Sequence, residues 1–265
     1  MSDHVRLDIQ DNIATLTLNR PEARNALSVE MREGLSEYLT QVDMDSKVRC
    51  VVLRGAGGHF MAGGDIKGFR ERQALSAEEK RGMLLRGIHD LHFAVYRMRK
   101  MAKPVIAGVQ GAAAGAGLSL VAACDMAIAA DTAFFTLAYA KIGLSPDASS
   151  TYFLPRMMGV KRAFELMYLA DRLDAETAME FGLVNRVVPE AELGQAVDEM
   201  AKRLAAGPTF AYGRGKALLN GSLHQTLESQ LELEAFAIAD CMDSEDFDEG
   251  TKAFVEKRLP VFKGK

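Results

Sequence analysis

The segment VIAGVQGAAAGAGLSLVAAC, residues 105–124, gives the clearest indication of the fold class. It opens with a short apolar run from Val105 to Val109, which is typical of a buried strand. The segment Gly111 to Gly117 contains only glycine and alanine, which predicts a loop with close backbone contacts. The apolar residues from Leu118 to Cys124 then predict a tightly packed helix. A strand, a tight loop and a helix in direct succession indicate an α/β fold.

Similar strand–loop–helix units recur at roughly 50-residue spacing, which indicates a spiral of similar turns. Two long helices are expected, one capped by Ser28 and running to about Asp45, the other from Ser76 to about Met101. The pattern beyond Ser149 predicts helices almost to the end, with breaks that include Gly182 to Pro189. The further expected strands are Val5 to Ile9, Ile13 to Leu18, Val48 to Arg54, Met126 to Ala130 and Phe134-Phe135.

These patterns divide the chain into two regions. We expect residues 1–200 to form an α/β core, and residues 201–265 to form an all-helical C-terminal extension that supports packing or oligomerisation. Hydrophobic residues make up 48% of the 265 residues and charged residues 26%, as in an ordinary soluble globular protein.

Charge and composition exclude several classes of function. The net charge of −4 gives no general case for binding nucleic acid or an anionic membrane. No apolar run reaches the roughly 20 residues of a membrane span, and the charged segment Met1 to Gln10 is unlike a signal peptide, so we expect a cytoplasmic protein. The cysteines form no CxxC pair and the histidines have no metal-binding spacing, so we expect no metal site.

Two glycine-rich loops, each after a buried strand, are the candidate site. The first is His59 to Asp65 and the second is Gly111 to Gly117. Small residues allow a ligand to approach the main chain closely, and the second loop leads into a helix whose first N–H groups have no partner within the helix. Such a site suits a developing oxyanion, where one donor contributes roughly 3 kcal/mol to lowering the barrier.

Two other interpretations of these loops remain. Gly/Ala runs also occur where helices pack closely, and taken alone the second loop is more often structural. A phosphate site is the weaker alternative, because neither loop is followed by Lys-Ser or Lys-Thr and no Gly-x-Gly-x-x-Gly opens a helix after a strand.

At these residues the chain closely resembles the crotonase, or enoyl-CoA hydratase/isomerase, superfamily. The matching stretches cover nearly the whole chain in the family's order and spacing. They are residues 18–27 (LNRPEARNAL), 60–67 (FMAGGDIK), 103–111 (KPVIAGVQG), 124–129 (CDMAIA), 143–147 (GLSPD), 154–156 (LPR), 178–188 and 254–258 (FVEKR).

The resemblance implies a spiral of ββα turns, a homotrimer or dimer of trimers, and an acyl-CoA thioester as substrate, with no permanently bound cofactor. It implies that the N–H groups of Gly64 and Ala116 are the two oxyanion donors. Phe69 and the segment Leu84 to Val95 are expected to line the acyl pocket. Residues matched to positions that contact coenzyme A are Ala23, Arg24, Asn25, Leu27, Ala62, Asp65, Ile66 and, across a subunit boundary, Lys257.

Departures from the family pattern point to the chemistry. Hydratases place two glutamates over the substrate, where this chain has Ser119 and, in the strand expected after Phe135, Tyr139. Asp147 matches an aspartate that shuttles a proton in family members that move double bonds or isomerise a ring epoxide, so we predict isomerase chemistry. The alternative for Asp147 is a helix N-cap before an apolar run.

Two further functions stay open. Asp147 also matches the nucleophile of 4-chlorobenzoyl-CoA dehalogenase, with His92 at the histidine-base position and Tyr139 at an aromatic position, which would suit an aryl-CoA or haloaryl-CoA hydrolase. His92 lies in an apolar stretch, however, where a histidine is more often a packing residue, and Tyr139 could simply line the acyl pocket. The third possibility is a catalytically silent acyl-CoA-binding protein.

Overall fold

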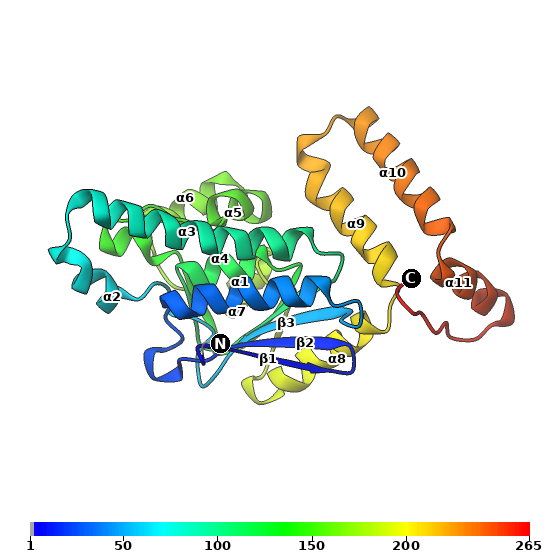
Figure 1. The fold of residues 1–265 in the computed structure, drawn as a ribbon, viewed down its shortest axis with the longest axis horizontal. Coiled ribbons are helices and arrows are strands. Elements are labelled where there is room, and N and C mark those ends of the chain that lie inside the picture. The colour runs from blue at the N-terminus through cyan, green and yellow to red at the C-terminus, as the bar shows by residue number, and fades with distance from the viewer. Residues whose placement is uncertain (1–2) are drawn as a thin grey trace.

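The computed structural model describes residues 3–265 and has a six-stranded sheet with helices on both faces (Figure 1). β1 (Val5–Gln10) and β2 (Ile13–Leu18) form the predicted hairpin, with Asp11 and Asn12 at φ 51° and 64° in its two-residue turn. The sheet continues with parallel strands in the order β2, β3 (Cys50–Gly55), β4 (Val105–Val109), β6 (Met126–Ala130) and β9 (Arg186–Val188).

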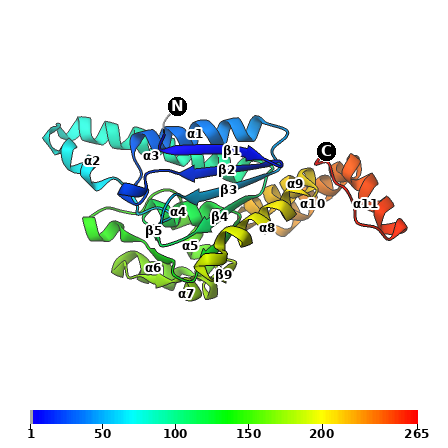
Figure 2. The same cartoon turned by 90° about the horizontal axis from the view of Figure 1, so that it is seen from below.

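Each face of this sheet is covered by helices. One face packs against α1 (Val29–Met44), α3 (Ala77–Lys100) and α4 (Ala116–Ala123), whose buried residues belong to the main hydrophobic core. α8 (Leu193–Ala205) covers the other face, where its Ala and Val side chains pack on β3, β4 and β6 (Figure 2). The buried Leu118 of α4 shows that the Gly/Ala loop leads directly into the core.

The two long N-terminal helices begin at the predicted caps. Ser28 accepts a hydrogen bond from the Met31 N–H at 3.1 Å at the start of α1. Ser76 and Glu79 form a reciprocal capping box at the start of α3. A cap satisfies N–H groups that the first helical turn cannot, which fixes where each helix starts.

A small three-stranded sheet corrects the predicted secondary structure. β5 (Ala112–Ala114) lies within the predicted loop and pairs in parallel with β7 (Phe134–Thr136), which pairs with β8 (Leu173–Asp174). β8 and β9 fall at breaks in the predicted helical pattern, with β9 inside the break from Gly182 to Pro189, and no strand was predicted at either place. These strands are two or three residues long and pair with distant segments, so no local periodicity marks them.

The remaining elements connect these layers. They are η1 (Pro21–Ala23), α2 (Ile66–Glu71), η2 (Arg72–Ala74), η3 (Ala138–Ile142), α5 (Ser150–Met158), α6 (Val160–Leu169), α7 (Ala175–Glu180) and η4 (Glu190–Glu192). Within residues 3–265, no helix is both long and apolar enough to span a membrane.

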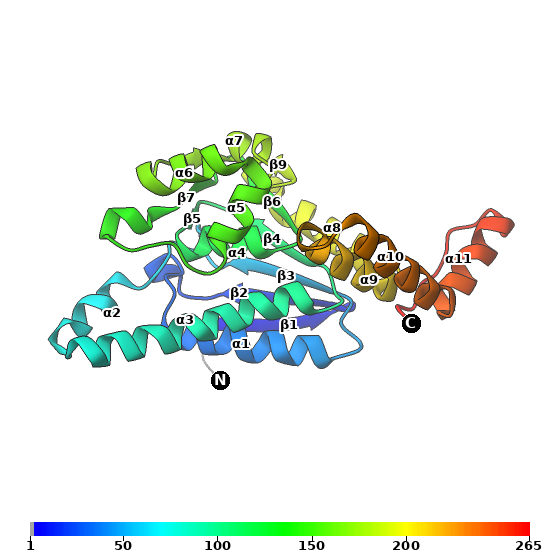
Figure 3. The same ribbon diagram turned by 90° about the horizontal axis from the view of Figure 1, so that it is seen from above.

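The C-terminal helices extend away from the sheet (Figure 3). They are α9 (Thr209–Gly221), α10 (Leu227–Met242) and α11 (Glu245–Glu256), with η5 (Ser222–His224) between the first two. α11 and α2 lie at opposite ends of the molecule in every view. The predicted boundary at residue 200 falls inside α8, and the division into two regions there stays a prediction.

Candidate functional site

The two glycine-rich turns are joined by main-chain hydrogen bonds. The Met61 N–H donates to the Ala112 carbonyl at 2.9 Å, and the Ala114 N–H donates to the Met61 carbonyl at 2.8 Å. A Cβ at Gly117 would lie only 2.5 Å from the Met61 carbonyl oxygen. Because real Cβ atoms do not approach so closely, glycine is required at this position for the two turns to meet.

The predicted oxyanion donors, Gly64 and Ala116, both face one cavity of about 300 Å³. Gly63 precedes the first donor at φ 101°, and Gly115 precedes the second at φ 52°. Ala116 is the first residue of α4, so its N–H has no partner within the helix. Among the turns, loops and caps of residues 3–265, neither N–H donates to a main-chain carbonyl. Both N–H groups are therefore available to a ligand oxygen.

The cavity is mainly apolar, with a few charged or polar groups. One wall comes from α2 and α3, and the Phe69 ring lies 3.1 Å from where a Cβ on Gly64 would be. The opposite wall comes from η3 and the segment that follows it. Residues of the segments predicted to line the acyl pocket are Phe69, Leu84, Gly87, Ile88 and Leu91, and residues of the opposite wall are Ala138, Tyr139, Lys141, Ile142, Leu144, Ser145 and Asp147.

Asp147 presents its carboxylate to this cavity and is held at two points. The Tyr139 hydroxyl donates to Asp147 Oδ1 at 2.5 Å, and the Ser119 hydroxyl oxygen lies 3.1 Å from the Asp147 main-chain oxygen. Burial and the neighbouring Asp147 charge raise the pKa of Tyr139, so its phenol stays protonated and can donate. Tyr139 lies in η3 and not in a strand as predicted, because β7 already ends at Thr136.

The Asp147 side chain does not cap the following helix. α5 begins at Ser150, its N-cap residue is Ser149 at φ 74°, and no side chain makes a cap hydrogen bond there. The Asp147 main-chain oxygen instead accepts a hydrogen bond from the Ser150 N–H at 3.2 Å. The side chain is therefore free of a capping role.

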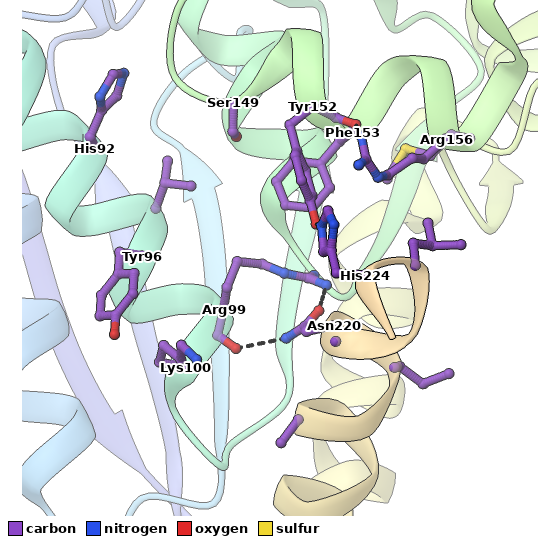
Figure 4. A pocket seen from close by; sticks show the side chains of 16 residues that line it. His92, Tyr96, Arg99, Lys100, Ser149, Tyr152, Phe153, Arg156, Asn220 and His224 are labelled. Carbon is purple, nitrogen blue, oxygen red and sulfur yellow. Dashed lines mark hydrogen bonds between the residues drawn. The ribbon is translucent and has the colours of Figure 1, made fainter. Parts of the chain in front are cut away.

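His92 lies beside the cavity but faces another space. Its Nε2 accepts a hydrogen bond from the Ala148 N–H at 3.3 Å. The ring lines a separate groove of about 740 Å³ between α3, α5 and α9. Figure 4 shows His92 on α3, across this groove from Tyr152 and His224. The structure thus brings His92 to the residue after Asp147 without placing it in the cavity that the Asp147 carboxylate lines.

The predicted coenzyme A segment is partly structural. Asn25 is fully buried, and its side chain accepts a hydrogen bond from the Arg20 N–H and donates to the Ala56 and His59 carbonyls. Asp65 binds Arg20 at 3.0 Å. Burial raises the pKa of Asp65, but hydrogen bonds from the Gly68 N–H and Arg20 outweigh it and lower the pKa overall.

The other predicted coenzyme A contacts occupy different places. Leu27, Ala62 and Ile66 line the cavity, whereas Ala23 and Arg24 do not. The Arg24 carbonyl accepts a hydrogen bond from the Ala62 N–H at 2.9 Å and so supports the first turn. Lys257 follows α11, which lies at the opposite end of the molecule from α2, the helix that supplies Ile66 and Phe69 to the cavity (Figure 1).

No metal site is found in residues 3–265, where no three His, Cys, Asp or Glu side chains are grouped suitably. Burial raises the pKa of the Cys50 thiol to about 12 and also raises the pKa of Cys124, so both stay protonated. The candidate site therefore consists of main-chain donors, one carboxylate and its supporting hydroxyl groups.

Arg32 is a cavity residue that sequence reasoning missed. Its guanidinium lies against Gly87 of α3, where a Cβ would be 2.6 Å from the Arg32 Cζ. The only sequence signal was its place one turn after Ser28, and that signal does not reveal how α1 packs against α3. Lys141 was missed for a similar reason, because the wall formed by η3 has no clear sequence pattern.

Two main-chain donors and one carboxylate around an apolar cavity define a class of enzyme sites that stabilise an oxyanion and move a proton. The family model for enoyl-CoA hydratase/isomerase matches residues 8–265. The chain belongs to this family and has the crotonase fold, as the sequence predicted.

Relatives within the family carry different names. The chain is 39% identical, over the full length of both proteins, to the 1,2-epoxyphenylacetyl-CoA isomerase of Escherichia coli. It is 33% identical to the 4-chlorobenzoyl coenzyme A dehalogenase-2 of an Arthrobacter species, over 97% of this chain and 92% of that protein. The crystal structure of an enoyl-CoA hydratase from a Polaromonas species is 33% identical, with a TM-score of 0.92 over 97% of this chain and 99% of that one.

Proposed function

We propose that this protein is an isomerase of acyl-CoA thioesters that shifts a double bond or isomerises a ring epoxide, with Asp147 as the proton shuttle. One observation carries the proposal: Asp147 lines the same cavity as Gly64 and Ala116, whose N–H groups are the predicted donors. The similarity to the epoxyphenylacetyl-CoA isomerase supports it.

The chemistry of a double-bond shift follows from this arrangement. The thioester oxygen would accept hydrogen bonds from both main-chain donors, which makes the neighbouring C–H bonds more acidic. Asp147 takes the proton from one carbon, and the C–H electron pair is delocalised into an enolate. The protonated Asp147 then returns the proton to a different carbon as the enolate collapses, so no atom is gained or lost.

The residues present argue against simple hydration. Adding water requires groups that position and activate it, and the two positions matched to glutamates hold Ser119 and Tyr139. Both hydroxyl groups are already engaged with Asp147. One carboxylate remains in the cavity, which suits proton transfer between two carbons of one substrate.

Replacement of Asp147 by asparagine tests the proposal. Asp147→Asn keeps the size of the side chain but removes the base, so kcat should fall by about 10²–10⁴-fold. The assay follows conjugation of the double bond in β,γ-hexenoyl-CoA and in a ring-unsaturated acyl-CoA. Asp8→Asn, an exposed carboxylate on β1, is the matched control and should keep wild-type turnover. Unchanged turnover in Asp147→Asn would remove Asp147 from the reaction.

A hydrolase or dehalogenase is the second candidate, supported by the similarity to the Arthrobacter dehalogenase. In that reaction the Asp147 carboxylate would displace chloride from the aromatic ring to form an aryl ester, and water activated by His92 would hydrolyse the ester and restore the carboxylate. Its test is mass spectrometry of the His92→Gln variant after mixing with 4-chlorobenzoyl-CoA. An adduct on Asp147 favours this candidate over the isomerase.

A protein that only binds acyl-CoA is the third candidate. Exchange of substrate α- or γ-protons with deuterated water separates it from both enzymes. Exchange that depends on Asp147 would exclude a silent binding protein.

A further inference from the structure

Beyond the proton shuttle itself, we infer that Tyr139 and Ser119 are positioning residues that decide which oxygen of Asp147 carries the proton. The inference rests on the proposed function, because it assumes that Asp147 is the base. In this chain, hydroxyl groups that hold Asp147 occupy the two positions matched to glutamates in hydratases.

The two oxygens of the Asp147 carboxylate are not equivalent. Oδ1 accepts the Tyr139 hydroxyl at 2.5 Å. No donor in residues 3–265 forms a hydrogen bond with Oδ2. A carboxylate oxygen that already accepts a strong hydrogen bond is the poorer proton acceptor. The proton taken from the substrate should therefore reside on Oδ2.

Ser119 holds the main chain of Asp147 in the same place. Its fully buried hydroxyl oxygen lies 3.1 Å from the Asp147 main-chain oxygen and 3.4 Å from the Tyr139 hydroxyl oxygen. Ser119 belongs to α4, one turn after Ala116, which begins that helix. The same helix thus carries the Ala116 donor and the Ser119 hydroxyl that holds Asp147. We therefore expect α4 to set the distance between the thioester and the carboxylate.

Three basic side chains lie close to Asp147. Arg32 from α1 and Lys141 from η3 line the same cavity, and His92 from α3 accepts a hydrogen bond from the N–H of Ala148. Removing the Tyr139 hydroxyl takes away the hydrogen bond to Oδ1, so the two carboxylate oxygens would lose the difference that orients the base.

Tyr139→Phe is the decisive variant, because it removes one hydroxyl and keeps the ring. We expect kcat for β,γ-hexenoyl-CoA to fall about 10- to 100-fold, as for loss of a hydrogen bond to a charged group, with KM nearly unchanged. A role in packing alone would change the shape of the cavity and so would raise KM as well.

Two further variants complete the test. Tyr152→Phe removes a tyrosine hydroxyl that forms a hydrogen bond with His224 in the separate groove, and it should leave kcat and KM at wild-type values. Ser119→Ala replaces a buried hydroxyl within an Ala-rich helix, so it should fold and lower kcat by about 3- to 10-fold. Ser119→Ala tests the positioning role independently if the Tyr139→Phe protein does not fold.

A double variant separates failure of this inference from failure of the proposed function. If Tyr139 acts through Asp147, then Tyr139→Phe with Asp147→Asn should be no slower than Asp147→Asn alone. A further loss of rate in the double variant, or a wild-type kcat in Tyr139→Phe, overturns the positioning role while Asp147 remains the base. Wild-type turnover in Asp147→Asn overturns the proposed function instead.

Discussion

The spiral core and the C-terminal arm, residues 209–265, differ in how far their large apolar side chains are exposed. Leu16 and Leu118 of the core are fully buried, whereas Phe254 and Leu259 of the arm are 86% and 88% exposed. Many apolar side chains of the core are buried in this way, although Met44 and Tyr168 are 79% and 67% exposed. The arm leaves large apolar side chains uncovered, which is typical of a surface that contacts another protein.

The candidate site is formed by residues of the core within a single chain. Gly64, Ala116 and Asp147 all belong to the core and meet within one chain. Lys257 belongs to the arm and follows α11, at the opposite end of the molecule from α2, which lines that cavity. The expected homotrimer or dimer of trimers would cover the arm and could bring Lys257 to a neighbouring cavity, and this assembly stays a prediction.

A matched pair of leucine truncations should show the largest contrast in stability. Leu118→Ala leaves a hole in a closed core and should lower the free energy of unfolding by about 2–5 kcal/mol. Leu259→Ala removes exposed surface and should change that of the dissociated chain by less than about 0.5 kcal/mol. Urea unfolding of both variants at one low protein concentration measures the difference.

Light scattering is the companion measurement for this pair. If the arm mediates assembly, Leu259→Ala should lower the average mass at a given concentration, and Leu118→Ala should not do so while it remains folded. Equal losses of stability, or a wild-type protein that is monomeric at high concentration, would contradict the contrast between core and arm.

Removing one helix cap from each region should give a smaller difference in the free energy of unfolding. Ser28 is buried and caps α1 at 3.1 Å, so Ser28→Ala should lower the global free energy of unfolding by about 1 kcal/mol. Thr226 caps α10 at 3.3 Å in the exposed arm. Thr226→Ala should mainly speed hydrogen exchange at the start of α10, because that helix can open locally. Equal shifts in global stability would show that the arm unfolds together with the core.

The smallest expected effect is the dependence of the arm's stability on pH. Hydrogen bonds from the Arg258 side chain and the Val261 N–H lower the pKa of Glu249 from 4.5 to about 2. The unfolded chain then binds the proton more readily, so this contribution to stability is present above pH 4.5 and is lost as the pH falls toward 2. Arg258→Gln should raise the pKa of Glu249, which NMR titration of the carboxylate can follow. An unchanged Glu249 titration would show that the ion pair does not form in solution.

Sequence reasoning succeeded where a local signal existed. Ser28 and Ser76 marked two helix starts because a capping side chain acts within three residues of itself. The apolar runs of β3 and β4 marked buried strands for a similar reason. The resemblance to the family placed Gly64 and Ala116, and the structure sets both on one cavity.

Features that depend on distant pairing could not be predicted in this way. β5 is three alanines, which have a weak strand preference, and its strand geometry comes from pairing with β7. The orientation of His92 depends on how α3 rotates against α5, which no pattern of apolar residues specified. The bond between Tyr139 and Asp147 joins residues on either side of an irregular segment, so only the folded chain shows it.

The bridge between Met61 and Ala113 has a consequence for how this scaffold can change its chemistry. Both N–H donors belong to the main chain, and main-chain hydrogen bonds join their turns, so the donors keep their places as long as Gly117 is kept. New reactions would then arise by exchanging side chains around the donors, above all at positions 119, 139 and 147, which makes those three the natural targets for redesign.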